Sequence, residues 1–423
     1  MWAEMLLGEY VRIEHGFAFK GEHFSEAGNY VILTPGNFHE AGGFRARPGK
    51  DRFYEARFPD RYLLSKGDLI VAMTEQGEGL LGSAALIPKS FMYLHNQRLG
   101  LVKEKSQVAD RRFLYYLFNT DTVRQQIRNS SSGAKVRHTS PERIYGVKVR
   151  VPVKVVQQKI AAILSAYDEL IENNQQRIAL LEKMAEEIYR EWFVRMRFPG
   201  HEKVKIIKGV PEDWKLVKLE NAFKFTGGGT PAKEVNRYWD GGDVNWFTPS
   251  DITGANGIFL ERSGEQCTEE GFNSSSAKMF PAYSVMLTSR ATIGALGINL
   301  TPACTNQGFI TCIPNAQYPL PYLYHWIKLA KPHFELLSGG ATFAELTKGT
   351  FKRIEILTPP ESIIIEFVRI ESPLFKAIEN HLKANSKLIE TRNKLLPRLI
   401  SGKLSVEHID IRFPPGMEES ACV

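Results

Sequence analysis

Residues 153–198 read VKVVQQKIAAILSAYDELIENNQQRIALLEKMAEEIYREWFVRMRF, a stretch that contains neither glycine nor proline. Its apolar side chains recur at alternating spacings of three and four, which is the pattern of a helix that packs lengthwise on another helix. A helix of about 40 residues at ~1.5 Å per residue is roughly 60 Å long, more than a small domain is wide. The stretch therefore predicts a long helical spacer rather than an ordinary core helix.

A second run, residues 361–400, is the simplest packing partner for this helix because it repeats the apolar spacing. Each seam holds one asparagine, Asn174 or Asn385, which would fix the register at some cost in stability. Pro373 and Pro397 interrupt the second run, so a kink or a late start is expected there. The predicted seam comprises Ile160, Leu164, Ile171, Asn174, Ile178, Leu181, Ile188 and Trp192 in the first run, and Ile378, Leu382, Asn385, Ile389 and Leu396 in the second.

The segments outside the two runs form another pair, because six landmarks occur in the same order in both. The landmarks are Leu33–Phe38 with Phe247–Ile252, Leu81-Gly82 with Leu296-Gly297, Asn96-Gln97 with Asn306-Gln307, Gly133-Ala134 with Gly340-Ala341, Val151-Pro152 with Thr358-Pro359, and Ile171–Asn173 with Ile378–Asn380. Each match alone is weak, but their common order predicts a duplicated module. Such a module suits a two-fold ligand such as duplex DNA.

Each copy contains an irregular block followed by its helical run. In the first block, the apolar runs 68–73 and 146–151 between glycine-rich turns predict strands. Helical spacing predicts one helix over 111–128 and its counterpart over 321–337. The blocks are therefore expected to be α+β. The expected segments are 1–152 and 201–360 for the two blocks, 153–200 and 361–402 for the helices, and 403–423 for a tail.

The composition is that of an ordinary globular protein with a modest basic excess. Hydrophobic residues make up 43% of the chain and the net charge is +7, which leans towards an anionic partner. The four cysteines show no Cys-x-x-Cys pair, which argues against structural zinc and a disulfide framework. The N-terminus lacks the pattern of a signal peptide, and no apolar run is long enough for a membrane span. A cytoplasmic protein is expected.

Motifs that would give the chain its own chemistry fail on context. Phe225–Gly229 resembles the Phe-x-Gly-x-Gly turn of S-adenosylmethionine sites, but a polar loop rather than a helix follows it, and no Asn-Pro-Pro-aromatic tetrad occurs. Ser401–Leu404 lacks the upstream glycine of a phosphate loop. A stand-alone DNA methyltransferase is therefore disfavoured. A coiled-coil scaffold whose blocks bind protein is a further alternative.

Several segments together resemble one family. They are Gln157–Ile160, Ile171–Asn174, Trp192-Phe193, Lys394–Gly402, Gly227–Pro231 and Thr288–Gly294. With them, the whole chain resembles the specificity subunit of Type I restriction–modification enzymes. The resemblance implies two target-recognition domains joined by two long antiparallel coiled-coil helices in an internal, circular pseudo-two-fold duplication. The alternative is a specificity component of a related multi-subunit DNA methyltransferase or defence system.

The resemblance also implies how such a chain works. Each domain would read one half of a bipartite, asymmetric sequence in double-stranded DNA, and the helices would act as a ruler. The helices would dock two modification subunits, which bind S-adenosylmethionine and methylate the base, and motor-nuclease subunits would join for restriction. The chain itself would hold no catalytic residue, metal or cofactor. Four aromatic residues near the end of the first run suggest the core of a subunit interface: Tyr189, Trp192, Phe193 and Phe198.

Three loops in each block are the candidates for contact with DNA, because basic and aromatic residues interleave there. Arg290, in the Thr-Ser-Arg turn of the second block, could contact phosphate or guanine. The first block departs there, with Thr74-Glu75-Gln76, so this role is not carried across. The candidates are Phe17, Phe19 and Lys20 with Thr230 and Lys233; Asn37 and Phe38 with Ser250 and Asp251; and Lys135, Arg137 and His138 with Thr342, Phe343 and Glu345.

Overall fold

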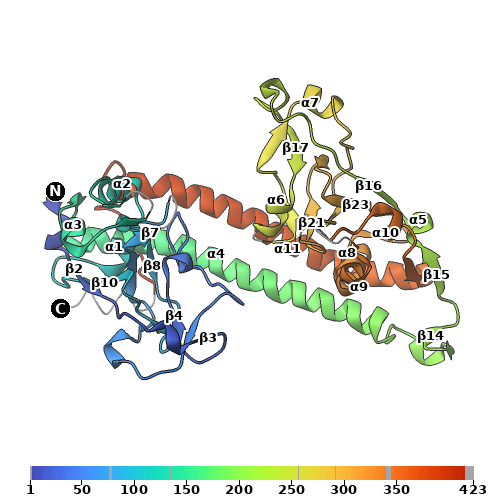
Figure 1. The fold of residues 1–423 in the computed structure, drawn as a ribbon, viewed down its shortest axis with the longest axis horizontal. Coiled ribbons are helices and arrows are strands. Elements are labelled where there is room, and N and C mark those ends of the chain that lie inside the picture. Colours follow the sequence, from blue (N-terminus) through green and yellow to red (C-terminus); the bar gives the residue numbers. More distant parts are fainter. Residues whose placement is uncertain are drawn as a thin grey trace. The chain divides into compact units, whose positions relative to one another are not determined.

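The computed structural model describes residues 2–75, 79–133, 136–255, 257–290, 292–339 and 344–414 (Figure 1). The chain forms two compact units. Unit 1 comprises Met1–Ile171 and Lys387–Val423, and unit 2 comprises Glu172–Ser386. Each unit holds one copy of the duplicated block and a part of each long helix. The predicted α+β duplication with two long helices is confirmed.

Both helical runs form long helices. α4 covers Lys154–Tyr189 and continues into a π-helical turn, η5, over Arg190–Val194. α11 covers Glu361–Ile400, so the late start expected at Pro373 was wrong. Proline removes the N–H that would bond to the carbonyl four residues earlier. Pro373 and Arg369, which carries that carbonyl, are both exposed, so water can replace the missing donor.

Within unit 2, the two helices pack in opposite directions. Asn174 Nδ2 donates a hydrogen bond to Asn385 Oδ1 over 2.9 Å. In η5, which continues α4, the ring centroid of Trp192 lies 5.7 Å from that of Phe367. Residues later in α4 therefore meet residues earlier in α11, as an antiparallel pair requires. The two asparagines expected to fix the register are bonded directly to each other.

Unit 1 contains two four-stranded sheets, ordered β2-β10-β6-β8 and β3-β5-β4-β9, and the pairs β1-β12 and β7-β11. Its strands are β1 (Ala3–Leu6), β2 (Val11–His15), β3 (Phe24–Ser25), β4 (Val31–Ile32), β5 (Phe53–Tyr54), β6 (Leu69–Ala72), β7 (Thr74–Glu75), β8 (Ala84–Leu86), β9 (Tyr93–Leu94), β10 (Leu99–Glu104), β11 (Arg137–His138) and β12 (Lys148–Val151). Its short helices are α1 (Arg111–Phe118), α2 (Asp121–Asn129) and α3 (Pro141–Tyr145). α4 and α11 pack here through Asp168, which accepts a hydrogen bond from Arg392.

Unit 2 contains a five-stranded sheet, β16-β23-β20-β21-β18, a three-stranded sheet, β19-β17-β22, and the pairs β13-β14 and β15-β24. Its strands are β13 (Ile206–Ile207), β14 (Val210–Pro211), β15 (Lys215–Lys218), β16 (Lys224–Gly227), β17 (Val244–Phe247), β18 (Phe259–Leu260), β19 (Glu265–Cys267), β20 (Val285–Thr288), β21 (Leu296–Asn299), β22 (Ala303–Thr305), β23 (Phe309–Ile313) and β24 (Glu355–Thr358). Its short helices are α5 (Leu219–Ala222), α6 (Pro249–Thr253), α7 (Glu269–Asn273), α8 (Leu320–Leu329), α9 (Lys331–Leu337) and α10 (Lys348–Phe351).

The central strand of each main sheet is apolar on both faces. In β6, Leu69 and Val71 face one hydrophobic cluster, while Ile70 and Ala72 face another. In unit 2, β20 divides its side chains between two clusters in the same way. A strand covered on both faces reads as a continuous apolar run rather than an alternating one. This is why the apolar run over 68–73 predicted β6 correctly.

Backbone hydrogen bonds fix the equivalence of the two blocks residue by residue. Gly82 N donates to Ala72 O, and Gly294 N donates to Thr288 O at the same point of the other sheet. Both glycines have positive φ, at 78° and 87°, where a side chain would be strained. Gly82 therefore corresponds to Gly294. Its predicted match with Gly297, three residues further along the chain, was wrong.

Each helix predicted over 111–128 and 321–337 is in fact two helices. In unit 1 the break lies at Asn119, whose side-chain amide bonds to both the N–H and the C=O of Ala84, at 3.0 and 3.1 Å. In unit 2 the break lies at Ala330, just before Pro332 in the first turn of α9. Proline is tolerated there because the first N–H groups of a helix have no intrahelical partner.

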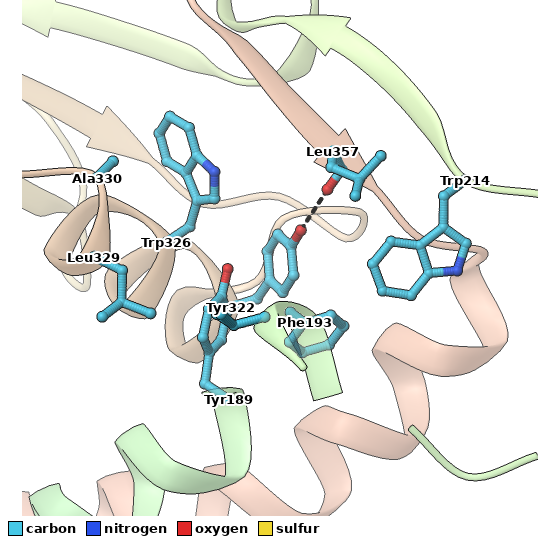
Figure 2. A pocket seen from close by; sticks show the side chains of 9 residues that line it. Tyr189, Phe193, Trp214, Tyr322, Trp326, Leu329, Ala330 and Leu357 are labelled. Carbon is cyan, nitrogen blue, oxygen red and sulfur yellow. Dashed lines mark hydrogen bonds between the residues drawn. The ribbon is translucent and has the colours of Figure 1, made fainter. Parts of the chain in front are cut away.

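The four aromatic residues expected at a subunit interface lie instead in the core of unit 2. Tyr189, Trp192, Phe193 and Phe198 are at most 7% exposed. Figure 2 shows Tyr189 and Phe193 beside Tyr322 of α8, whose hydroxyl donates to the carbonyl of Leu357 over 2.8 Å. A cavity of about 250 Å³ remains among these rings. The expected interface role was wrong, because Tyr322 of α8 and Phe367 of α11 cover three of these side chains and Trp214 covers Phe198.

Candidate nucleic-acid interface

Loops from distant parts of the sequence gather at one end of the main sheet in unit 1. Phe17, just after β2, forms a bridge with Asn96, just before β10. Beside them, β7 pairs with β11 in the register Thr74 with His138. The segments that follow β2 and β6 therefore meet the segment that precedes β10 at one end of the sheet. This end is called the loop edge below. A rigid sheet presenting loops in this way is a common basis for recognition.

Unit 2 builds the same edge with the equivalent residues. Gly229 N donates to Thr305 O, as Phe17 N donates to His95 O in unit 1. Arg290 forms a bridge with Glu345, in the place that Thr74 and His138 take in unit 1. The two units therefore share a loop framework.

Candidates in the first loop differ in what their side chains can reach. In unit 1, Phe17 and Phe19 are half-buried, and their rings are 5.1 Å from each other. Phe19 also packs 4.8 Å from Tyr54, so packing accounts for its aromatic character. Lys20 is exposed and lies 3.8 Å from Glu22. Of the three, Lys20 has the side chain that is free to meet a phosphate.

The first loop of unit 2 is held by side-chain contacts. Lys233 donates to Glu265 over 2.7 Å, and its ammonium lies 3.6 Å from the centre of the Trp239 ring. Thr230 Oγ1 donates to Gln307 Oε1 over 2.7 Å, which ties the loop to the turn before β23. Lys233 therefore connects the first loop to Glu265 and Trp239 within the unit, in addition to adding positive charge to the surface.

The second loop is capped by the residues that were candidates for base contact. Asn37 Oδ1 accepts from Thr34 N over 3.0 Å, and Asp251 Oδ2 accepts from Thr248 N over 2.7 Å. Asn37 is 3% exposed and Phe38 is 1% exposed, so neither side chain reaches solvent. Capping and burial account for these three residues. Ser250, in contrast, is exposed at the start of α6.

The third loop lies partly outside the described residues. Lys135, Thr342 and Phe343 fall there. Arg137 and His138 are exposed on β11, and His138 Nδ1 lies 3.2 Å from Thr74 Oγ1. Arg290 Nε and Glu345 Oε1 form an ion pair over 2.8 Å. Sequence set Thr74-Glu75-Gln76 against the Thr-Ser-Arg turn, and the structure places Thr74, the first of these residues, in the position equivalent to Arg290.

The turn before β10 and the turn before β23 carry exposed polar residues that were not among the predicted candidates. Gln97 and Arg98 in unit 1 and Gln307 in unit 2 are exposed at the same edge, in the turn before β10 or β23. Asn96 and Asn306 shape this turn, since each side chain accepts from the N–H two residues later, at 3.1 and 2.9 Å. The repeated Asn-Gln pair was the available signal, and its exposed glutamine is the member that faces solvent.

The predicted seam residues of the long helices are all buried or half-buried. Ile160, Leu164, Ile171, Ile178, Trp192, Ile378 and Asn385 are buried, and Asn174, Leu181, Ile188, Leu382, Ile389 and Leu396 are half-buried. His381 adds to the polar pair, with its Nδ1 3.1 Å from Asn174 Oδ1.

Close backbone packing accounts for the glycines that resemble a cofactor turn. A Cβ added to Gly228 would lie 2.0 Å from the carbonyl oxygen of Asn306, and one added to Gly229 would lie 2.4 Å from Ala277 N. Across the described ranges, no cluster of three or more His, Cys, Asp or Glu side chains is arranged to hold a metal ion. None of the described helices has the length and hydropathy of a membrane span.

Comparisons with known proteins agree with this geometry. The family model described as "Type I restriction modification DNA specificity domain" matches residues 1–183 and 211–388. The MjaIX specificity subunit of Methanocaldococcus jannaschii is 34% identical over 199 residues, a match that covers 47% of this chain and 46% of that one. The HindI specificity subunit of Haemophilus influenzae is 24% identical over 409 residues, which cover 81% of this chain and 87% of that one.

A solved structure shares the fold over nearly the whole chain. It is the S subunit of a Type-I restriction-modification system from M. genitalium, with a TM-score of 0.61 and 16% sequence identity. The match covers 95% of this chain and 96% of that one.

Proposed function

The chain belongs to the specificity subunits of Type I restriction–modification systems, and on that premise we propose that each of its two units reads one half of a bipartite DNA target. The observation that carries this proposal is the shared loop edge. The same backbone hydrogen bonds present loops in both units, while the exposed side chains on those loops differ. Two unlike readers on one framework suit an asymmetric target.

The loop edge supplies the chemistry that base and phosphate contacts need. In unit 1, Arg98, Arg137 and His138 are exposed there, together with Gln97. In unit 2, Arg290 and Gln307 are exposed at the equivalent edge. Arginine and glutamine form paired hydrogen bonds with purine edges in the major groove, and arginine also binds phosphate. The chain acts as a reader, and methyl transfer belongs to a partner.

The family and the long helices support a proposal for the partners. Two modification subunits, which bind S-adenosylmethionine, dock on the helices, and motor-nuclease subunits join them for restriction. Exposed apolar side chains on α4 support such a docking surface. Leu180 and Met184, one helical turn apart in unit 2, are 62% and 52% exposed, and Leu170 in unit 1 is 54% exposed. Leu180 and Met184 are four residues apart, so they lie on the same face of the helix and are suited to an apolar contact.

Replacing Leu180 and Met184 by aspartate tests the docking surface. The double variant should lose co-purification of at least one modification subunit, because charge replaces the apolar contact. Leu216→Asp is the matched control, since Leu216 is 64% exposed but lies on strand β15 rather than on α4. Retention of both subunits by the double variant would contradict docking on this face of α4.

Methylome sequencing of cells with and without this gene tests the reading of a bipartite target. With the cognate modification subunits present, methylation should appear at two short defined sequences separated by a fixed unread gap. Methylation at one continuous motif would contradict the proposal, and so would methylation of the same bipartite motif in cells that lack this chain.

A further inference from the structure

One position on the loop edge carries different polar pairs in the two units. In unit 1, Met73 N donates to Arg98 O and Thr139 N donates to Met73 O. In unit 2, Ser289 N donates to Gly308 O and Leu346 N donates to Ser289 O. These bonds make Met73 equivalent to Ser289, so the residues that follow them, Thr74 and Arg290, occupy the same place.

The strand across from this place is equivalent as well. His138 N donates to Ser132 O over 2.8 Å, and Glu345 N donates to Gly339 O over 3.1 Å. The side-chain pair Thr74 with His138 in unit 1 therefore corresponds to Arg290 with Glu345 in unit 2. Backbone geometry is the same at this position, and only the polar groups differ.

In unit 2 the pair is an arginine oriented by a carboxylate. Arg290 Nε lies 2.8 Å from Glu345 Oε1, and the arginine side chain remains 52% exposed. A bond at Nε leaves at least part of the terminal guanidinium edge available. Two parallel N–H groups of arginine match the O6 and N7 acceptors of guanine. Holding the planar group in place lowers the entropy that binding would otherwise lose.

In unit 1 the pair is a histidine oriented by a hydroxyl. His138 Nδ1 lies 3.2 Å from Thr74 Oγ1, and Thr74 is 9% exposed whereas His138 is exposed. With Nδ1 engaged, Nε2 is the ring nitrogen left for DNA. It can form one hydrogen bond to a base edge, where arginine can form two.

We propose that this position reads one base in each half-site: Arg290, oriented by Glu345, recognises guanine for unit 2, and His138, oriented by Thr74, reads the corresponding base for unit 1. The inference rests on the proposed function, since it names the residues through which each unit recognises its half-site. It assigns Glu345 and Thr74 positioning roles, because each acts through the side chain that meets the base.

Substitution of Arg290 tests the assignment in the chain assembled with its modification subunits. Arg290→Ala should relax one guanine in the half-site of unit 2, with a loss of discrimination of about 5- to 150-fold at that base. Arg290→Lys keeps the charge but not the planar fork, so it should relax the same base. The half-site of unit 1 should stay unchanged in both variants, which shows that the chain is folded. Methylome sequencing and competition between duplexes differing at one base measure these effects.

A transplanted pair gives a sharper result. Arg290→Thr combined with Glu345→His places the pair of unit 1 in unit 2. The guanine preference should be replaced by the base that unit 1 selects at its equivalent position. Glu345→Gln, which keeps an acceptor but removes the charge, should weaken the guanine preference less than Arg290→Ala.

The outcomes separate this inference from the proposed function. Absence of a bipartite motif for the unaltered chain would contradict the proposed function itself. A normal motif for the unaltered chain, with guanine retained at every position in Arg290→Ala, would overturn the inference alone. Uniform weakening across all sequences by Arg290→Ala, rescued by Arg290→Lys, would also overturn it, because a phosphate contact behaves in that way.

Discussion

Unit 1 places Tyr116 and Leu164 where its short helices meet α4, and unit 2 places His325 and Glu371 at the equivalent positions of α8 and α11. Tyr116 is equivalent to His325 because Leu114 N donates to Asp110 O as Leu323 N donates to Pro319 O. Leu164 is equivalent to Glu371 because Val156 N donates to Val153 O at the start of α4 as Ile363 N donates to Pro360 O at the start of α11. All four side chains are at most 5% exposed.

The two pairs satisfy their polar groups differently. Tyr116 donates to Asp168 over 2.6 Å, whereas His325 Nε2 lies 3.5 Å from Glu371 Oε2 and neither side chain has a hydrogen-bond partner. Burial raises the pKa of Glu371 to about 8 and lowers the pKa of His325 to about 3, so the pair is neutral rather than ionic near pH 7. The same framework therefore holds a hydrogen-bonded tyrosine in unit 1 and a buried polar pair without hydrogen bonds in unit 2.

The largest effects should come from the aliphatic and aromatic residues that occupy equivalent places on the long helices. Ile160 and Phe367 are both fully buried, and the Phe367 ring contacts Phe193 at 4.8 Å. Phe367→Ala should destabilise unit 2 by about 3–5 kcal/mol, and Ile160→Ala should destabilise unit 1 by about 2–5 kcal/mol, through cavity formation. Hydrogen exchange of peptides from β20 and β6 reports each unit. Equal loss of protection in both units from one variant would show that the units do not unfold separately.

A medium effect of opposite sign is expected for Glu371→Leu, which gives unit 2 the residue type of unit 1. The variant should stabilise unit 2 by about 1–3 kcal/mol at pH 7.5, because it removes a buried polar group without a partner. Hydrogen exchange of β20 peptides measures the gain, and Leu164→Ile in unit 1 serves as the control. Destabilisation by Glu371→Leu would mean that the pair holds the helices together.

The same pair predicts a pH dependence. Folding raises the pKa of Glu371 from its ordinary value of 4.5 to about 8, so the folded chain holds a proton that the unfolded chain releases. Stability should therefore fall as pH rises through this window. His325, with its pKa lowered from 6.5 to about 3, has the opposite effect below pH 6.5. Between pH 6.5 and 8 the slope should approach ~1.4 kcal/mol per pH unit at most, and Glu371→Leu should abolish it in thermal unfolding.

The smallest effects should come from helix caps that the two units share. Ser140 caps α3 by accepting from Arg143 N, and Thr347 caps α10 by accepting from Thr350 N. Ser140→Ala and Thr347→Ala should each cost about 1 kcal/mol, and by similar amounts, because the caps lie at equivalent positions. Chemical denaturation measures both. A large difference between the two would show that the loops before these helices carry unequal strain.

The long helices were predictable because their signal is periodic and local. The absence of glycine and proline over 153–198 and the spacing of seam residues defined α4, and the paired asparagines followed from the same spacing. The effect of Pro373 was not predictable in this way. Whether a proline ends a helix depends on whether the orphaned carbonyl faces water, and that is a tertiary property.

The loop edge was predictable in outline but not residue by residue. The equivalent turns were marked by Thr34-Pro35 and Thr248-Pro249. The Asn37 and Asp251 side chains, which were candidates for base contact, cap these turns instead. Sequence set Thr74-Glu75-Gln76 against Thr288-Ser289-Arg290, but it did not show that Thr74 matches Arg290, because the two differ in residue type. Only the backbone hydrogen bonds on either side reveal it.

The central claim, that each unit reads its own half-site through its own loops, is tested most directly by duplicating one unit's block. Leu7 N donates to Val147 O, and Leu219 N donates to Ile354 O, so these bonds mark equivalent boundaries. A chain in which a copy of residues 7–147 replaces residues 219–354, assembled with the modification subunits, should methylate a target with the same sequence in both half-sites. Methylation of the original asymmetric target by this chain would contradict the account.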